Sequence, residues 1–177
     1  MSSKLPSRER AIRLLRENHC PANVISHCKA VAKLAVETAQ MCQKKGYKVD
    51  VNLVEVGALL HDLGRAKTHS VDHVVVGAEI ARVAGLPDSV LAIIRRHIGG
   101  GITPAEAQML GWPKENYMPT SLEEKIVSYA DKLIETSDRV PIEKTLKKLR
   151  EDKLDAAANR VQKIHEEIAR LSGSNYD

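Results

Sequence analysis

GALLHDLGR, the segment from Gly57 to Arg65, joins an apolar helical stretch to a glycine-containing loop and places His61 beside Asp62 at the junction. An imidazole nitrogen and a carboxylate oxygen offered from one point of the chain are suited to a divalent metal ion. The two side chains lie about 100° apart around a helix, so they need not bind the same ion, and Asp62 can bridge two ions. The pair alone is a weak signal, and its meaning depends on the other candidate ligands.

Four further candidate ligands lie in separate segments on both sides of this pair: His27, His73, His97 and Asp131. Five of the six candidates lie within or at the ends of predicted helices, which hold side chains more accurately than loops do, and His97 lies where a helix runs into three glycines. Imidazole and carboxylate ligands without thiolates suit Fe, Mn, Co, Ni or Zn, and mixed His and Asp sites with open positions are typical of catalysis. The sequence therefore predicts a catalytic site for divalent transition metal ions.

Helical periodicity runs through nearly the whole chain, and no strand candidate exceeds a few residues. Ser7, Asn23 and Ser121 are predicted helix N-caps, because their side-chain oxygens can accept from the first free backbone N–H groups. The predicted helices cover about residues 8–18, 23–45, 51–61 and 71–84, followed by one from 87, a short one from 104, one from 121 and a long one from 141 to 171. The predicted fold class is all-α, with an extra C-terminal helix.

The composition favours one globular domain. Hydrophobic residues make up 43% of the 177 residues, with one Trp and no Phe, so the core is expected to consist of Leu, Val, Ile and Ala. The 27 basic and 23 acidic residues nearly balance, which makes nucleic-acid binding an unfavoured function. Three cysteines without CxxC spacing, no signal peptide and no long apolar run predict a cytoplasmic protein with no membrane partner.

The order of His27, the His-Asp pair and Asp131 resembles the HD superfamily of metal-dependent phosphohydrolases, an all-α family. HDLGR looks like the HDIG variant of its motif, with Leu63 in place of Ile. GGGITP stands where the HD-GYP phosphodiesterases carry their GYP element, so the nearest likeness is a compact, stand-alone archaeal-type HDIG protein. The resemblance implies an N-terminal helix at 1–20, an HD metal-binding catalytic domain at 21–137 and a C-terminal helical extension at 138–177, packed on the same domain.

The resemblance also implies how the ligands are shared between two metals. His73 followed by Gly77, and then His97, are similar to the additional ligands of two-metal members. One metal would be held by His27, His61, Asp62 and Asp131, and the other by Asp62, His73 and His97. His69, one helical turn before His73, is a competing candidate that fits the family pattern less well.

The implied activity is hydrolysis of a small phosphate ester or anhydride, a nucleotide or dinucleotide, by a metal-activated hydroxide. Two metals about 3.5–4 Å apart can share this hydroxide and stabilise the phosphoryl transition state. Two alternatives stay open. One is a one-metal 5′-nucleotidase-like enzyme in which His73 and His97 shape the pocket, and the other is a non-catalytic nucleotide-binding module.

Arg65 follows the motif directly and is the predicted phosphate ligand, with a catalytic role beside Asp62, because a guanidinium matches phosphate oxygens in pairs. Lys67, Arg96 and Lys132 are further predicted substrate ligands. Residues 99–101, all glycine, favour a flexible connector over a phosphate-binding loop. The lysines of the C-terminal segment are interpreted as a solvated helix face, whose apolar side packs on the domain or on a second copy in a homodimer.

Overall fold

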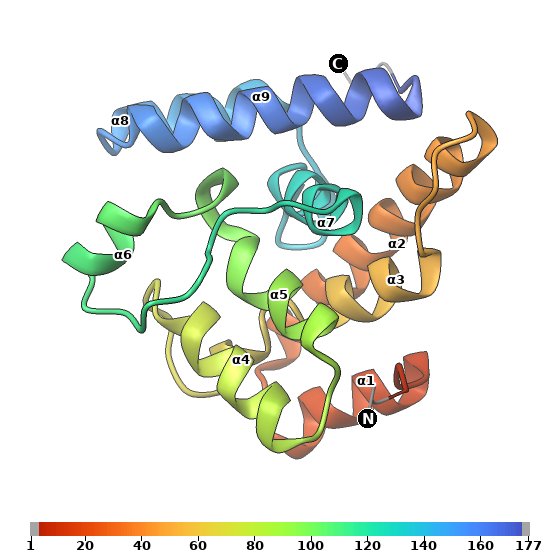
Figure 1. Cartoon of the computed structure of the whole chain (residues 1–177), viewed down its shortest axis with the longest axis vertical. Helices are drawn as coiled ribbons and strands as arrows, with labels where there is room; N and C mark the ends of the chain where they lie inside the picture. The colour runs from red at the N-terminus through yellow and green to blue at the C-terminus, as the bar shows by residue number, and fades with distance from the viewer. Residues whose placement is uncertain (1–3, 175–177) are drawn as a thin grey trace.

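The computed structural model describes residues 4–174, which are almost entirely helical (Figure 1). In chain order the elements are α1 (Arg8–Glu17), α2 (Ala22–Lys44), α3 (Val51–Leu60), the 3-10 turn η1 (Leu63–Ala66), α4 (His73–Val83), α5 (Asp88–Arg96), the 3-10 turn η2 (Ile98–Gly100), α6 (Pro104–Met109), α7 (Leu122–Lys132), β1 (Ile134–Glu135), β2 (Asp138–Arg139), α8 (Ile142–Glu151) and α9 (Asp155–Ser172). The strands form a two-residue antiparallel hairpin. The all-α prediction is confirmed.

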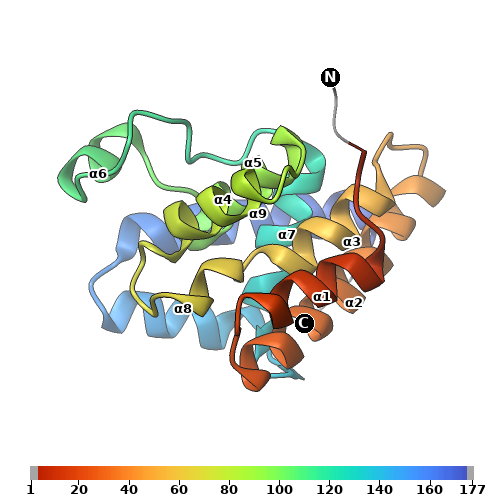
Figure 2. The same ribbon diagram turned by 90° about the horizontal axis from the view of Figure 1, so that it is seen from below.

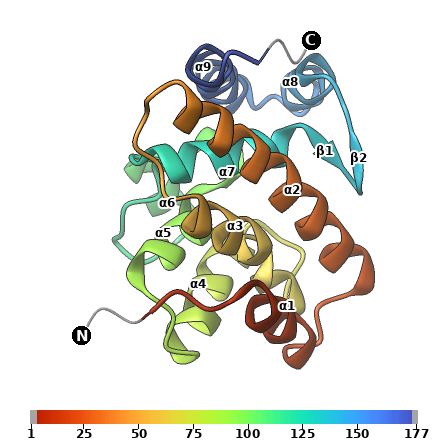
Figure 3. The ribbon, with the colours of Figure 1, turned by 90° about the vertical axis from the view of Figure 1, so that its right-hand side faces the viewer.

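Helix α7 lies in the middle of the molecule and contacts α2, α3, α5 and α9. Helices α8 and α9 lie across one end, while α1 and α4 lie at the other (Figures 1 and 3). Helix α6 and the loop that follows it project at the edge far from α2 and α3 (Figure 2). Because α7 touches so many neighbours, a side chain on it can meet residues from distant parts of the sequence.

Small side chains let the helices approach closely, as the composition predicts. The buried residues of α2 include five small, fully buried side chains: Cys28, Ala32, Ala35, Ala39 and Cys42. Gly57 on α3 faces α5, where an added Cβ would lie 2.4 Å from the Cδ1 atom of Ile93. A larger residue at 57 would therefore push α5 away, together with the histidine at its end.

Two local predictions are wrong. Helix α2 begins after Pro21 without a side-chain cap, so Asn23 is not the N-cap, whereas Ser7 and Ser121 do accept the predicted backbone bonds. The long C-terminal helix is two helices, α8 and α9, because Lys153 adopts a left-handed backbone with φ of 60° and breaks the run. The break lets α8 and α9 pack against each other. Within residues 4–174, no helix has the length and apolar character needed to cross a membrane.

Candidate metal centre

All six predicted ligands lie together at the meeting point of five helices. His27 comes from α2, His61 and Asp62 from the end of α3, His73 from the start of α4, His97 from the end of α5, and Asp131 from α7. Neighbouring imidazole rings have centroids 4.8–5.4 Å apart. Three of the four rings are at most 2% exposed, so the cluster is part of the protein interior.

Each histidine turns the same nitrogen away from the cluster. The Nδ1 atoms of His61, His73 and His97 lie 2.7, 2.8 and 2.8 Å from the carbonyl oxygen of the residue three positions earlier. The Nδ1 atom of His27 lies 3.0 Å from the carbonyl oxygen of Thr136, in the β1–β2 turn. A carbonyl can only accept, so Nδ1 carries the proton and Nε2 presents its lone pair to the cluster. This is the tautomer that a metal ligand requires.

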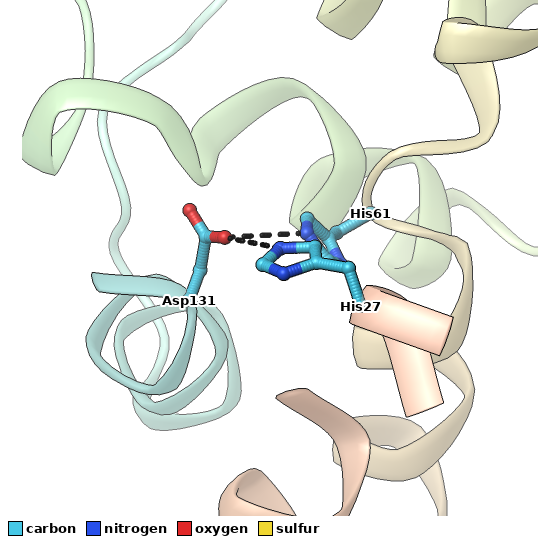
Figure 4. Close-up of side chains that lie close together, drawn as sticks. All are labelled: His27, His61 and Asp131. Atoms are coloured by element: carbon cyan, nitrogen blue, oxygen red, sulfur yellow. Dashed lines mark hydrogen bonds and ion pairs between the residues drawn. The ribbon is translucent and has the colours of Figure 1, made fainter. Parts of the chain in front are cut away.

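Asp131 closes one side of the cluster. Its Oδ1 atom lies 3.1 Å from Nε2 of His27 and 3.4 Å from Nε2 of His61 (Figure 4). Its other oxygen pairs with the ammonium group of Lys132. Two imidazole nitrogens and one carboxylate oxygen therefore converge from α2, α3 and α7, and they can hold one metal.

Asp62 stands between the two sides. Its Oδ2 atom lies 3.7 Å from Nε2 of His61, while Oδ1 lies 3.1 Å from Nε2 of His73 and 3.6 Å from Nε2 of His97. One oxygen of the carboxylate thus faces His61, and the other faces His73 and His97. This is the arrangement expected of a carboxylate that bridges two metals.

The nitrogen lone pairs of the cluster are better suited to binding a cation than to hydrogen bonding among themselves. Among residues 4–174, the buried Nε2 atom of His61 has no hydrogen-bond partner. The Nε2 atoms of His73 and His97 lie 3.3 Å apart, and both present lone pairs because both Nδ1 atoms donate. Two lone pairs repel at this distance unless a positive charge lies near both. The residues present are therefore suited to metal ions.

The electrostatics of the cluster favour charged carboxylates and a neutral His97. Burial alone would raise the pKa of Asp62, but His61 and the contacts with His73 and His97 hold it well below the usual range. Burial would likewise raise the pKa of Asp131, but Lys132, His27 and His61 hold it well below the usual range. Burial lowers the pKa of His97 to about 4, so its lone pair is available at neutral pH.

His61 differs from His97. Burial disfavours its charged form, yet the adjacent Asp62 outweighs this effect, and the pKa of His61 is raised well above the usual value. The position beside Asp62 therefore favours a positive charge, which a metal ion supplies in place of the proton.

Two glycines allow the helix that carries His73 to approach the HDLG turn. An added Cβ at Gly64 would lie 1.9 Å from the carbonyl oxygen of His73, and one at Gly77 would lie 2.8 Å from the backbone nitrogen of Gly64. Neither position has room for a side chain. The spacing of four residues between His73 and Gly77 therefore has a packing cause.

A cavity of about 790 Å³ opens onto the cluster. His27, Asp62, His97 and Asp131 lie on its surface, with Arg65 and Lys132 beside them. One of its walls is the face of α8 that carries Lys144, Lys147 and Lys148. Metals held by the cluster would therefore be reachable by a small molecule.

Comparison with known proteins agrees with this geometry. The HD domain family matches residues 24–135, which is more than half of the chain. The chain belongs to the HD-domain family. It is a metal-dependent phosphohydrolase, as the motif order predicts.

This HD-domain protein is 46% identical over 165 residues to an uncharacterized protein of Methanocaldococcus jannaschii, covering 92% of the chain and 97% of that protein. It is 36% identical over 173 residues to a tRNA (cytidine(56)-2′-O)-methyltransferase of Picrophilus torridus, covering 98% of the chain but 49% of that protein. The chain thus spans about half the length of this second relative. The HD domain of the L. monocytogenes phosphodiesterase PgpH, solved in complex with cyclic-di-AMP, has the same fold, with a TM-score of 0.56, 19% identity, and coverage of 93% of this chain and 98% of that one.

Of the four predicted substrate ligands, Arg65 and Lys132 line the cavity, whereas Lys67 and Arg96 do not. Arg65 lies at the cavity, with its Nε atom 3.4 Å from Oδ1 of Asp62 and its Nη1 atom 2.5 Å from the carbonyl oxygen of His69. Lys132 also lines the cavity. Lys67 is exposed and lies outside the cavity lining, and His69 is exposed on the surface, apart from the cluster that contains His73.

Arg96 lies away from the cavity. Its Nη1 atom donates to both carboxylate oxygens of Glu124, at 2.9 and 3.0 Å, and its Nε atom donates to the carbonyl oxygen of Asn116. Arg96 therefore ties the end of α5 to the start of α7. The structure does not bring it to a substrate.

The glycine segment after His97 forms a 3-10 turn that packs against α9, whereas the sequence favoured a flexible connector. An added Cβ at Gly100 would lie 2.7 Å from the Cβ atom of Arg160, on α9. The Nε atom of Arg160 donates to the carbonyl oxygen of Gly99, at 3.3 Å, and its Nη2 atom donates to Glu106 on α6. Helix α9 thereby holds the turn that leads away from a candidate ligand.

Two groups of functional atoms were missed from the sequence. The carbonyl oxygens that orient the histidines carry no residue-type signal, because every residue has one. The lysines of α8 did carry a signal, since positions 144, 147 and 148 lie on one helix face. Charge alone did not show that this face lines a cavity.

Proposed function

We propose that this protein hydrolyses a phosphodiester or phosphate anhydride bond of a nucleotide at a site of two divalent transition metal ions. The observation that carries the proposal is the position of Asp62, whose Oδ2 atom faces Nε2 of His61 while its Oδ1 atom faces Nε2 of His73 and of His97. A one-metal site does not need a carboxylate in this position. The proposed first metal is held by His27, His61, Asp62 and Asp131, and the second by Asp62, His73 and His97.

The protein's own groups set the chemistry of this site. When bound, the two metals would lower the pKa of a coordinated water and offset the charge that develops on the phosphoryl oxygens. The Nδ1-to-carbonyl bonds keep every histidine in the tautomer that binds metal. Arg65 lies at the cavity edge, where its guanidinium can donate to a phosphate oxygen. Lys132 keeps Asp131 oriented through their ion pair.

The substrate class follows from the cavity and from a relative of the same fold. A volume of about 790 Å³ is suited to a nucleotide or dinucleotide rather than to a single phosphate ion. The related PgpH HD domain has been solved with cyclic-di-AMP. Methyl transfer is not part of the proposal, because the methyltransferase of Picrophilus torridus is about twice as long as this chain and the atoms gathered here are metal ligands.

The deciding experiment is metal analysis by mass spectrometry on protein purified without chelators, followed by turnover assays with Mn or Fe on bis(p-nitrophenyl) phosphate, nucleotides and dinucleotides. Near two metals per chain, with turnover, supports the proposal. Near one metal favours the 5′-nucleotidase-like enzyme, with His73 and His97 as pocket residues. Metal binding without turnover on any of these compounds favours the non-catalytic nucleotide-binding module.

Arg65→Ala tests the phosphate role separately from metal binding. We expect KM to rise about tenfold, because one charge-assisted hydrogen bond to phosphate is lost, while metal content stays the same. Lys67→Ala is the matched control, since it removes an exposed cation two positions away that does not line the cavity. A fall in metal content in Arg65→Ala would show that its bond to Asp62 matters more than substrate contact.

A further inference from the structure

Helix α8 forms a wall of the cavity although it follows the segment that matches the HD domain family, which ends at residue 135. Lys144, Lys147 and Lys148 all line the cavity, and their spacing of three and four residues places them on one face of the helix. The apolar residues Ile142 and Leu146 are buried beneath them. The three lysines are exposed, but they line the same cavity as the candidate ligands His27, Asp62, His97 and Asp131.

A hydrogen bond connects α8 to the end of α7, next to the candidate ligand Asp131. The Oγ1 atom of Thr145 donates to the carbonyl oxygen of Lys132, at 2.8 Å. Lys132 is the last residue of α7 and follows Asp131, a candidate ligand. The hydrogen bond therefore holds the backbone of α8, from which the lysines project, close to the end of α7.

The three lysines differ in their availability. Lys144 pairs with Glu135. Lys147 lies 3.8 Å from Glu151, but both side chains are well exposed, and such pairs contribute little. Within residues 4–174, the ammonium group of Lys148 makes no hydrogen bond or close ion pair, and its charge acts at longer range on Glu135, whose pKa it helps to lower. Lys147 and Lys148 are therefore free to bind an anion.

The wall is longer than one phosphate group. From Lys144 to Asp152, both on the cavity, α8 rises about 12 Å at 1.5 Å per residue. An ester whose reacting phosphate lies at the metals would leave Lys147 and Lys148 unused unless it carried a second anionic group. The same wall includes Glu135, Glu151 and Asp152, so it is not the continuous basic track that a long nucleic acid requires.

We propose that Lys147 and Lys148 bind a second phosphate of the substrate, which makes the preferred substrate a dinucleotide or similar short molecule with two phosphates. This inference rests on the proposed function, because it places the reacting phosphate at the metals. The second phosphate binds away from the metals and adds affinity without taking part in bond cleavage.

The test compares the binding of two probes to the manganese-loaded protein by calorimetry. One probe is AMP, and the other is 5′-phosphorylated diadenylate whose internal linkage is a phosphorothioate, which resists hydrolysis. The double variant Lys147→Ala, Lys148→Ala removes the proposed subsite. Arg150→Ala is the matched control, since it removes a cation from the same helix that does not line the cavity. Metal content and thermal midpoint are measured for every variant.

We expect the wild-type protein to bind the dinucleotide about tenfold more tightly than AMP, and the double variant to lose this preference. Arg150→Ala should keep it. Equal affinity of the wild-type protein for both probes, an equal loss for both in the double variant, or no binding of either would overturn the inference. None of these results bears on turnover of bis(p-nitrophenyl) phosphate, which tests the proposed function independently. Tighter binding of a long oligoadenylate than of the dinucleotide would point to a nucleic-acid groove and would also overturn it.

Discussion

The two sides of the candidate metal centre are held in different ways. His61, His73 and His97 each turn Nδ1 to a carbonyl three residues earlier, so a single turn of the chain, helical for His61 and His97 and preceding α4 for His73, orients the ring. His27 instead depends on the carbonyl of Thr136, 109 residues away. Both histidines of the proposed second metal, His73 and His97, are thus held by local structure, whereas the side of the first metal is complete only when α2 and the β1–β2 hairpin pack together and position His27.

The distant contact also involves backbone strain. Thr136 has a φ of 58°, a left-handed conformation that residues other than glycine rarely adopt. Such strain costs on the order of 1–3 kcal/mol and persists only where the surrounding structure enforces it. The side that contains His27 should therefore be the easier one to disturb without unfolding the protein.

Asp62→Ala should have the largest effect, because Asp62 faces both sides. We expect turnover to fall by more than about 100-fold and metal content to fall on both sides, since loss of a direct ligand exceeds the 10–100-fold effect of a supporting residue. Metal analysis and steady-state rates check this. Asp88→Ala, an exposed carboxylate on α5, is the control. Retention of both metals in Asp62→Ala would exclude a bridging carboxylate.

His97→Ala and His27→Ala separate the two sides. Each should remove about one metal per chain, and the metal that remains should bind with the affinity of the undisturbed side. Mass spectrometry of the two variants, with wild-type protein purified alongside, measures this. If His97→Ala leaves metal content and rate unchanged, the second metal does not exist.

Substitutions at Thr136 test the long-range contact by itself. Proline has a φ near −65° and cannot adopt the observed backbone, so Thr136→Pro should move the carbonyl away from His27. We expect a loss of about 10–100-fold in metal affinity on that side. Thr136→Gly keeps the conformation and should retain metal, with stability within about 1 kcal/mol of wild type. Equal metal affinity in the Pro and Gly variants would mean that this carbonyl does not orient His27.

Gly77→Ala should have the smallest of these effects, on the locally held side. The added Cβ would lie 2.8 Å from the backbone nitrogen of Gly64, and overpacking of this kind typically costs about 1–3 kcal/mol. Thermal or denaturant unfolding measures the loss, and metal titration shows whether His73 has moved with α4. Val83→Ala, at the exposed end of the same helix, should change neither quantity.

The sequence predicted what depends on residue type and local spacing. The six candidate ligands lie together as the order of their motifs required, although their role as ligands stays a prediction. The capping residues Ser7 and Ser121 were also correct, because a cap involves only the next few residues. Arg96 was predicted to be a substrate ligand, yet it pairs with Glu124, which lies 28 residues further along the chain.

The remaining features depend on long-range packing or on backbone atoms. The residue type at position 136 does not predict that the Thr136 carbonyl accepts a hydrogen bond from His27. The break at Lys153 was missed because the helical spacing of apolar residues in the sequence shows no interruption there. That error hid the lysine wall, since only a chain that turns at this point brings α8 over the cavity.

The hydrogen bond from Arg160 to the carbonyl of Gly99 also implies an order in which the site is formed during synthesis. A chain is synthesised from its N-terminus, so all six candidate ligands leave the ribosome before Arg160, which lies 61 residues beyond Gly99. A nascent chain therefore has the complete set of metal-binding side chains before α9 is available to hold the turn after His97. The turn after His97 thus takes its final packing last, when α9 supplies Arg160 to the carbonyl of Gly99.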